Sequence, residues 1–177
     1  MISHLRQRFN AAFTPEKYQA FQNTMHTEFG EAVTFRLSET PVFVPQALKN
    51  KILQGVEDIS AVLTRPDFRQ RSEAAIPKHL RVPNEDEHSI FMQLDFGICR
   101  DADGNLTPQL IELQGFPSLY FFQHLMARAY RKHYDIPEDF HHLFGGISRE
   151  EYLDILLLII IYDLKPENVI LLAFVPD

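Results

Sequence analysis

Residues 89–120 contain two runs in which apolar and polar side chains alternate, one on each side of Asp103-Gly104. An Asp-Gly pair between two alternating runs is typical of a β-hairpin closed by a two-residue type I′ turn. The sequence therefore predicts an antiparallel pair of strands at residues 90–99 and 107–115. This hairpin is the strongest structural constraint in the chain, because its turn also fixes which side chains face each other.

A two-residue turn sets the register of the predicted hairpin. The expected partners across it are Ala102–Asn105, Cys99–Pro108, Asp95–Glu112 and Gln93–Gln114. Asp95 and Glu112 would then lie opposite each other with Cα atoms about 4.5 Å apart, the spacing of a non-hydrogen-bonded pair. Gln93 and Gln114 flank the two acids on the same face. The opposite face is expected to carry Met92, Leu94, Phe96, Ile111 and Leu113.

The facing carboxylates admit two interpretations. Like charges directly opposite each other cost roughly 0.2–1 kcal/mol, so a protein that retains them usually places a cation or a shared proton between them. Two carboxylates with amide carbonyls are the oxygen ligands that suit Mg²⁺ bound together with phosphates. The other interpretation is a solvent-facing hairpin that tolerates two acids. The residues alone do not separate the two.

The same segment also carries a family resemblance. "LDFGICRDADGNLTPQLIELQGFPSLY" (residues 94–120) resembles the metal-binding hairpin of ATP-grasp ligases, and is most similar to the circularly permuted branch typified by glutathionylspermidine synthase. Asp95, Glu112 and Gln114 fall on the Asp, Glu and Asn of that family's pattern. The resemblance implies that these three residues bind Mg²⁺, which bridges ATP phosphates. It also implies an ATP-dependent ligase that joins a small-molecule carboxylate to an amine through an acyl phosphate.

Two positions depart from the family pattern, and both bear on how ATP would bind. Gln93 stands where the family has an Arg that contacts phosphate, and Gln114 replaces an Asn with a side chain one methylene longer. Gln93 is nevertheless the expected nucleotide contact on the hairpin. Lys78 and Arg81, in the basic segment "PKHLR", are the other expected ATP-binding residues, although a solvated charged face is the alternative for them. No catalytic residue is assigned.

The rest of the chain predicts an α/β fold, with α+β as an alternative. Helices are expected at residues 15–29, between Thr14 and Gly30, and at 46–63, 118–134 and 148–164; further strands are expected at 32–38, 40–45 and 169–175. Residues 1–117 form an expected helical N-terminal region that carries the metal hairpin at 89–117. Residues 118–177 resemble the start of a pre-ATP-grasp α/β domain, and the two regions are also compatible with one compact unit.

The resemblance covers only part of what an ATP-grasp enzyme needs. Lysine-bearing strands and a Gly-rich loop that close over the nucleotide do not appear before Asp177. We therefore expect the N-terminal part, or a shortened relative, of a ligase that is incomplete for catalysis by itself. The alternative is a non-catalytic α/β module that completes a larger assembly. Its strand at 169–175 would be an edge that pairs with a missing segment or with another chain.

A kinase is excluded by the order of its apparent motifs. Asp163, Lys165 and Asn168 have the spacing of a kinase catalytic loop, and Asp95-Phe96-Gly97 matches a second kinase motif. In a kinase the catalytic loop precedes the Asp-Phe-Gly motif, whereas here the order is reversed. The chain also has no glycine-rich loop of the kinase pattern. The two matches therefore predict no phosphoryl-transfer site.

Composition narrows the partners and the compartment. A net charge of -7 argues against nucleic-acid binding, which requires a basic surface. The one cysteine, Cys99, cannot form an internal disulfide and favours a reducing compartment. The most apolar run, at residues 155–162, has about eight residues, whereas a membrane-spanning helix needs about 20. We expect a soluble cytoplasmic protein with no membrane partner.

Overall fold

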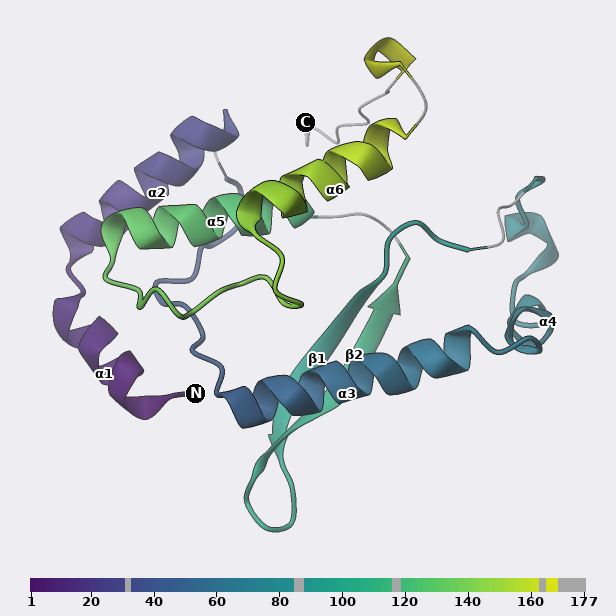
Figure 1. The fold of residues 1–177 in the computed structure, drawn as a ribbon, viewed down its shortest axis with the longest axis horizontal. Coiled ribbons are helices and arrows are strands. Elements are labelled where there is room, and N and C mark those ends of the chain that lie inside the picture. Colours follow the sequence, from purple (N-terminus) through teal and green to yellow (C-terminus); the bar gives the residue numbers. More distant parts are fainter. Residues whose placement is uncertain (31–32, 85–87, 116–118, 163–164, 169–177) are drawn as a thin grey trace. The chain divides into compact units, whose positions relative to one another are not determined.

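The computed structural model of this chain describes residues 1–30, 33–84, 88–115, 119–162 and 165–168 (Figure 1). The chain divides into two compact units, Met1–Asp135 and Ile136–Asp177. The described residues contain six α-helices and a two-stranded antiparallel sheet, about 52% helix and 11% strand. This confirms the predicted mixed α/β class, with the α+β arrangement of a separate hairpin and helices. The functional division expected after residue 117 stays a prediction.

Two helices open the first unit. Helix α1 (Ser3–Ala12) was not predicted, and α2 (Pro15–Phe29) was. The start of α2 is fixed by Thr14, whose hydroxyl accepts a hydrogen bond from the Lys17 backbone N–H at 3.2 Å. Its end is fixed by Gly30, which has a φ of 87° in the left-handed region where glycine is favoured. The local residue types at both ends therefore determine this helix, as predicted.

The core of the first unit lies between α2 and α5 (Tyr120–His133), which pack against each other. Phe21 and Met25 of α2 are 0% exposed. The ring of Tyr130, on α5, stacks on Phe21 with 4.5 Å between ring centroids. Large aromatic side chains bury much apolar area each, so this stack is a main source of stability for the unit.

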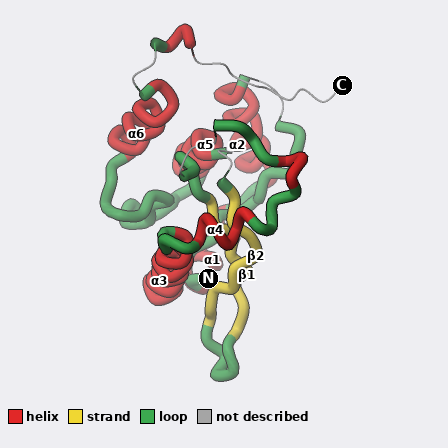
Figure 2. The backbone as a smooth tube through the Cα atoms, turned by 90° about the vertical axis from the view of Figure 1, so that its right-hand side faces the viewer, coloured by secondary structure: helices red, strands yellow, loops and turns green. Residues whose placement is uncertain are grey.

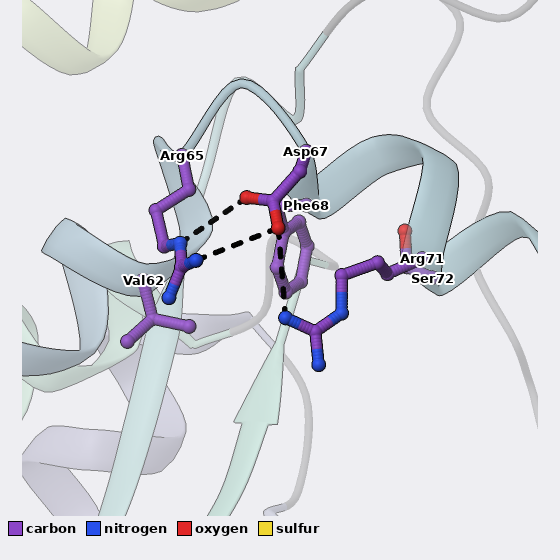
Figure 3. A pocket seen from close by; sticks show the side chains of 6 residues that line it. All are labelled: Val62, Arg65, Asp67, Phe68, Arg71 and Ser72. Atoms are coloured by element: carbon purple, nitrogen blue, oxygen red, sulfur yellow. Dashed lines mark hydrogen bonds and ion pairs between the residues drawn. The ribbon is translucent and has the colours of Figure 1, made fainter.

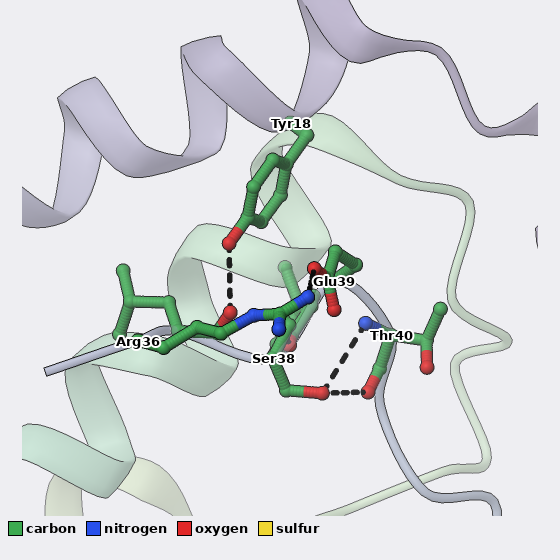
Figure 4. A network of polar contacts seen from close by, with 7 residues as sticks. Tyr18, Arg36, Ser38, Glu39 and Thr40 are labelled. Atoms are coloured by element: carbon green, nitrogen blue, oxygen red, sulfur yellow. Dashed lines mark hydrogen bonds and ion pairs between the residues drawn. The ribbon is translucent and has the colours of Figure 1, made fainter.

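The prediction of strands at residues 32–38 and 40–45 is wrong for the described residues, 33–38 and 40–45. Residues 33–45 form neither a helix nor a strand, and the segment bends at residues 35, 39 and 40. Its apolar side chains Leu37 and Phe43 are buried, and the Tyr18 hydroxyl donates a hydrogen bond to the Leu37 carbonyl at 2.7 Å (Figure 4). A side chain from α2 thus satisfies a backbone group that a neighbouring strand would otherwise satisfy.

Helix α3 (Gln46–Leu63) has the predicted bounds and lies against the hairpin (Figure 2). One close approach involves Gly55, where an added methyl group would lie 3.5 Å from the ring of Phe96. Phe96 points from the first strand of the hairpin toward the helix. Helix α3 therefore covers part of the face that carries Phe96, and the face that carries Asp95 is the opposite one, because side chains alternate along a strand.

The hairpin consists of β1 (Gln93–Arg100) and β2 (Leu106–Gln114), close to the predicted strands. Its turn differs from the prediction. The Asp101 N–H donates to the Asn105 carbonyl at 2.9 Å and closes a three-residue loop, in which Gly104 has a φ of 82°. A three-residue loop with a left-handed glycine is the usual alternative to a two-residue turn. The Asp101 carboxylate accepts the N–H of Asn105, and this backbone hydrogen bond lowers the pKa of Asp101.

Two short elements follow α3. Helix α4 spans Phe68–Glu73, and a 3₁₀ turn spans Lys78–Leu80. No helix in the described ranges combines the length and the apolar character needed to cross a membrane.

The second unit contains α6 (Arg149–Ile161) and a 3₁₀ turn (Pro166–Asn168). The helix begins at Ser148, whose side chain accepts from the Glu151 N–H while Glu151 accepts from the Ser148 N–H. This reciprocal arrangement is a capping box. Asp163 and the strand predicted at residues 169–175 lie outside the described residues.

Candidate metal-binding site

Asp95 of β1 and Glu112 of β2 are direct partners across the hairpin, as the sequence predicts. Gln93 and Gln114 also face each other, and they form the adjacent pair on the same face of the hairpin. The strands reach this pairing through a β-bulge, because Phe96 pairs with Leu110 and leaves Ile111 without a partner residue. Near the turn the register differs from the prediction by one residue.

Both glutamine amides contact the carboxylates. Gln93 Nε2 donates to Asp95 Oδ1 at 3.1 Å, and Gln114 Nε2 lies 3.5 Å from Asp95 Oδ2. Gln114 Nε2 also donates to Glu112 Oε1. One amide nitrogen therefore lies between the two acids and offsets part of their mutual repulsion. It occupies the kind of position, between two carboxylates, in which a cation is most strongly attracted.

The side-chain oxygen of Gln93 is a second indication that this cluster binds an ion or a water. Gln93 Oε1 is buried and has no hydrogen-bond partner among the residues that the structure describes. A buried polar atom without a partner costs about 1–3 kcal/mol, so such atoms are usually paired with water or with an ion. This oxygen belongs to the same cluster as the two carboxylates, since its own amide nitrogen contacts Asp95.

The donor set fits Mg²⁺ with one rearrangement. Rotation of the Gln114 amide by half a turn presents its oxygen in place of its nitrogen, since the amide has a donor and an acceptor end. The site then offers the oxygens of Asp95, Glu112 and Gln114. Within the described ranges, no group of three or more His, Cys, Asp or Glu side chains lies close enough to hold a metal. Two carboxylates suit Mg²⁺, which keeps several waters and binds phosphate oxygens for the remainder.

The bulge changes the surroundings of the acids. The sequence predicts Ile111 on the apolar face, but a methyl group built on Gly97 would lie 3.5 Å from Ile111 Cδ1. Gly97 is two residues from Asp95 and shares its face. Ile111 therefore lies on the carboxylate face, where it is 69% exposed. This corrects the prediction, and the physical reason is the extra residue that the bulge inserts into β2.

Lys78 and Arg81, the basic residues expected to bind ATP, make their contacts outside this cluster. Lys78 is exposed on its 3₁₀ turn, and the Arg81 guanidinium donates to the Glu73 carbonyl at 3.1 Å. Within the described part of the chain, no hydrogen bond or ion pair joins either residue to Asp95 or Glu112. Of the expected nucleotide contacts, the structure brings only Gln93 into contact with an expected metal ligand, Asp95.

Comparisons with known proteins add no relative. Protein-family models, curated proteins and solved structures were all compared with this chain, and none of them matched.

Proposed function

We propose that the hairpin binds Mg²⁺ through Asp95, Glu112 and Gln114 together with ATP phosphates, as part of an ATP-grasp-type ligase. The observation that carries the proposal is the direct pairing of Asp95 with Glu112, with an amide nitrogen between them. Two facing carboxylates repel each other in the absence of a counter-charge. A divalent cation bound between them makes the electrostatic free energy of the group favourable.

Each residue has a distinct role in this proposal. Asp95 and Glu112 supply the negative charge, and Gln114 supplies a neutral oxygen that completes the protein's share of the ligands. Gln93 holds Asp95 in place through its amide nitrogen and remains a proposed nucleotide contact, and a water bound in the site would satisfy its buried oxygen. When bound, Mg-ATP supplies a phosphoryl group for the activation of a small carboxylate that then reacts with an amine. Lys78 and Arg81 remain proposed phosphate contacts.

The exposed Cys99 fits a reducing compartment, and the cytoplasm is the proposed location.

A non-catalytic binding module is the second candidate, and one observation favours it. The sheet has two strands within the described residues, and two strands alone are marginally stable. Apolar side chains on the hairpin, including Ile98 and Leu110, remain exposed. A partner strand or a second chain that adds to the sheet would cover them. In this case the hairpin is an assembly surface, and metal binding is not required.

The test is a titration of the chain with Mg²⁺, in which the backbone amide NMR signals of β1 and β2 are monitored. Mn²⁺ at trace levels then locates the site, because it broadens the signals of nearby nuclei. We expect saturable shifts at Asp95 and Glu112, and weakening by about tenfold or more in Glu112→Gln. Loss of a mere hydrogen-bonded neighbour of a metal ligand already costs about 10- to 100-fold in affinity.

Asp103→Asn is the matched control, because Asp103 is an exposed acid in the loop of the same hairpin. Equal weakening in Asp103→Asn and Glu112→Gln indicates diffuse attraction to an acidic chain and contradicts the site. Absence of saturable binding contradicts it as well. A further titration with ATP separates the candidates: metal-dependent nucleotide binding supports the ligase, whereas binding of neither supports the assembly module.

A further inference from the structure

A cavity of about 360 Å³ lies where the end of α3 meets α4 (Figure 3). Six side chains line it: Val62, Arg65, Asp67, Phe68, Arg71 and Ser72. Its volume falls within the range of about 300–1,000 Å³ that is usual for small-molecule sites. The residues expected to bind metal are not among its lining residues, so it is a separate feature of the molecule.

The lining residues carry an excess of positive charge. Arg65 donates to both oxygens of Asp67, from Nε at 3.1 Å and from Nη2 at 3.4 Å. Arg71 Nη1 lies 3.5 Å from Asp67 Oδ2. Two guanidinium groups thus share a single carboxylate, as the dashed lines in Figure 3 show. One positive charge in the cavity is left without a counter-charge among its lining residues.

The shared carboxylate also positions the two arginines. A guanidinium has five N–H donors in a fixed plane. Arg65 directs two of them to Asp67, and Arg71 forms an ion pair with the same carboxylate, so most of the donors stay available. Such planar donors bind carboxylate and phosphate groups in a two-point fashion. Because Asp67 restrains both side chains, less rotational freedom is lost when an anion binds them.

The same cavity has an apolar side, formed by Val62 and Phe68. Ligand sites commonly combine apolar walls with a few polar groups that fix the orientation of the ligand. We propose that this cavity binds a small organic anion. Arg65 and Arg71 hold its carboxylate or phosphate group, and its apolar part packs on Phe68 and Val62. This site is independent of the proposed magnesium site.

Arg69 provides an internal comparison for this assignment. It lies on α4 between Phe68 and Arg71 in sequence, but it pairs with Glu73 at 3.3 Å and does not line the cavity. Its charge is therefore balanced one to one, unlike that of the two cavity arginines. A general attraction of anions to this basic helix would involve Arg69 as strongly as Arg71, whereas a built site would not.

The experiment titrates the metal-free chain with benzoate, phenyl phosphate, benzyl alcohol and inorganic phosphate, and follows the amide NMR signals of residues 62–72. We expect saturable shifts with benzoate and phenyl phosphate, and weaker binding of the neutral alcohol and of inorganic phosphate. The ratio of the affinities for benzoate and phenyl phosphate shows whether a carboxylate or a phosphate is preferred. Equal affinity for benzoate and benzyl alcohol, or no saturation by either anion, overturns the proposal.

Three variants sharpen the test. Arg71→Gln removes one guanidinium and weakens benzoate binding by about two- to fivefold, the range expected for one solvent-exposed ion pair. Arg69→Gln leaves the affinity unchanged. Asp67→Asn keeps an oxygen acceptor but removes the competing charge, so it strengthens binding. Equal weakening by Arg69→Gln and Arg71→Gln, or weaker binding in Asp67→Asn with an unchanged amide spectrum elsewhere, contradicts an anion site.

Discussion

Asp95 lies directly opposite Glu112, although β1 and β2 change register between this pair and the turn. The loop closed by Asp101 and Asn105 is one residue longer than the predicted turn, which displaces the partners by one position. The bulge at Ile111 then displaces them by one position in the opposite direction. The two changes cancel at the carboxylate pair. The acids therefore face each other because of a compensating bulge, and the bulge belongs to the site as much as the acids do.

Removal of one facing charge should stabilise the chain when no cation is present. Glu112→Gln relieves a like-charge pair, and we expect the free energy of unfolding to rise by about 0.2–1 kcal/mol in the presence of a chelator. Urea denaturation measures it. With Mg²⁺ at a concentration that saturates the unmodified chain the order reverses, because the unmodified chain gains more binding free energy than the weaker-binding Glu112→Gln. Asp103→Asn shows neither effect. If the unmodified chain and Glu112→Gln keep the same order of stability with and without Mg²⁺, the prediction is contradicted.

Gly55→Ala is expected to stabilise the chain. Glycine inside a helix costs roughly 0.5–1 kcal/mol relative to alanine. The added methyl group would lie 3.5 Å from the Phe96 ring, which is an ordinary van der Waals contact. Thermal and urea unfolding should both show the gain. Gly55→Leu is the counterpart, since its larger side chain displaces Phe96 and loses stability. A loss of stability in Gly55→Ala contradicts an ordinary van der Waals contact between this position and Phe96.

Local chemistry explains which helices could be predicted from the sequence. Thr14 and Gly30 mark the two ends of α2, and each acts on its nearest backbone neighbours. The bounds of α3 follow from a regular apolar pattern and are confirmed. The facing of Asp95 and Glu112 was also predicted, but from a two-residue turn and an unbroken register, and it holds only because the longer loop and the bulge cancel.

Contacts between distant residues explain what could not be predicted. The segment at 33–45 has alternating apolar residues, but its Leu37 carbonyl is satisfied by the hydroxyl of Tyr18. No pattern within the segment indicates that contact. The bulge did leave a local signal: Leu110 and Ile111 are consecutive apolar residues in an otherwise alternating strand. That break in period is where the extra residue lies.

Loss of the cap on α2 should destabilise the first unit. Thr14→Ala removes the side-chain oxygen that accepts from the Lys17 N–H, and such changes typically cost about 1 kcal/mol. Thr27→Ala is the matched control, because Thr27 is exposed within the same helix and alanine has the higher helix propensity. Urea denaturation should therefore place Thr14→Ala below the unmodified chain and Thr27→Ala at or above it. Equal effects contradict a capping role.

Stability should fall in alkaline solution because of Tyr130. Burial raises the pKa of this tyrosine from 10.0 to about 12, and its side chain is only slightly exposed. Below about pH 10 both the folded and the unfolded chain keep the phenolic proton, so the stabilisation is fully present. Between about pH 10 and about pH 12 the unfolded chain loses this proton first, which favours unfolding. The loss amounts to about 2–3 kcal/mol at its limit.

Urea unfolding at a series of pH values, together with the ultraviolet absorbance of phenolate, measures this dependence. Tyr130→Phe is less stable near neutral pH by about 1 kcal/mol, because its hydroxyl no longer donates to the Ser38 carbonyl. Its stability should then fall less steeply above about pH 10, since one titrating group is gone. Burial also raises the pKa of Tyr18 and Tyr134, so part of the slope remains. Tyr162→Phe removes an exposed tyrosine and should retain the full slope. An unchanged slope in Tyr130→Phe would mean that its phenol titrates alike in both states, which contradicts its burial against α2.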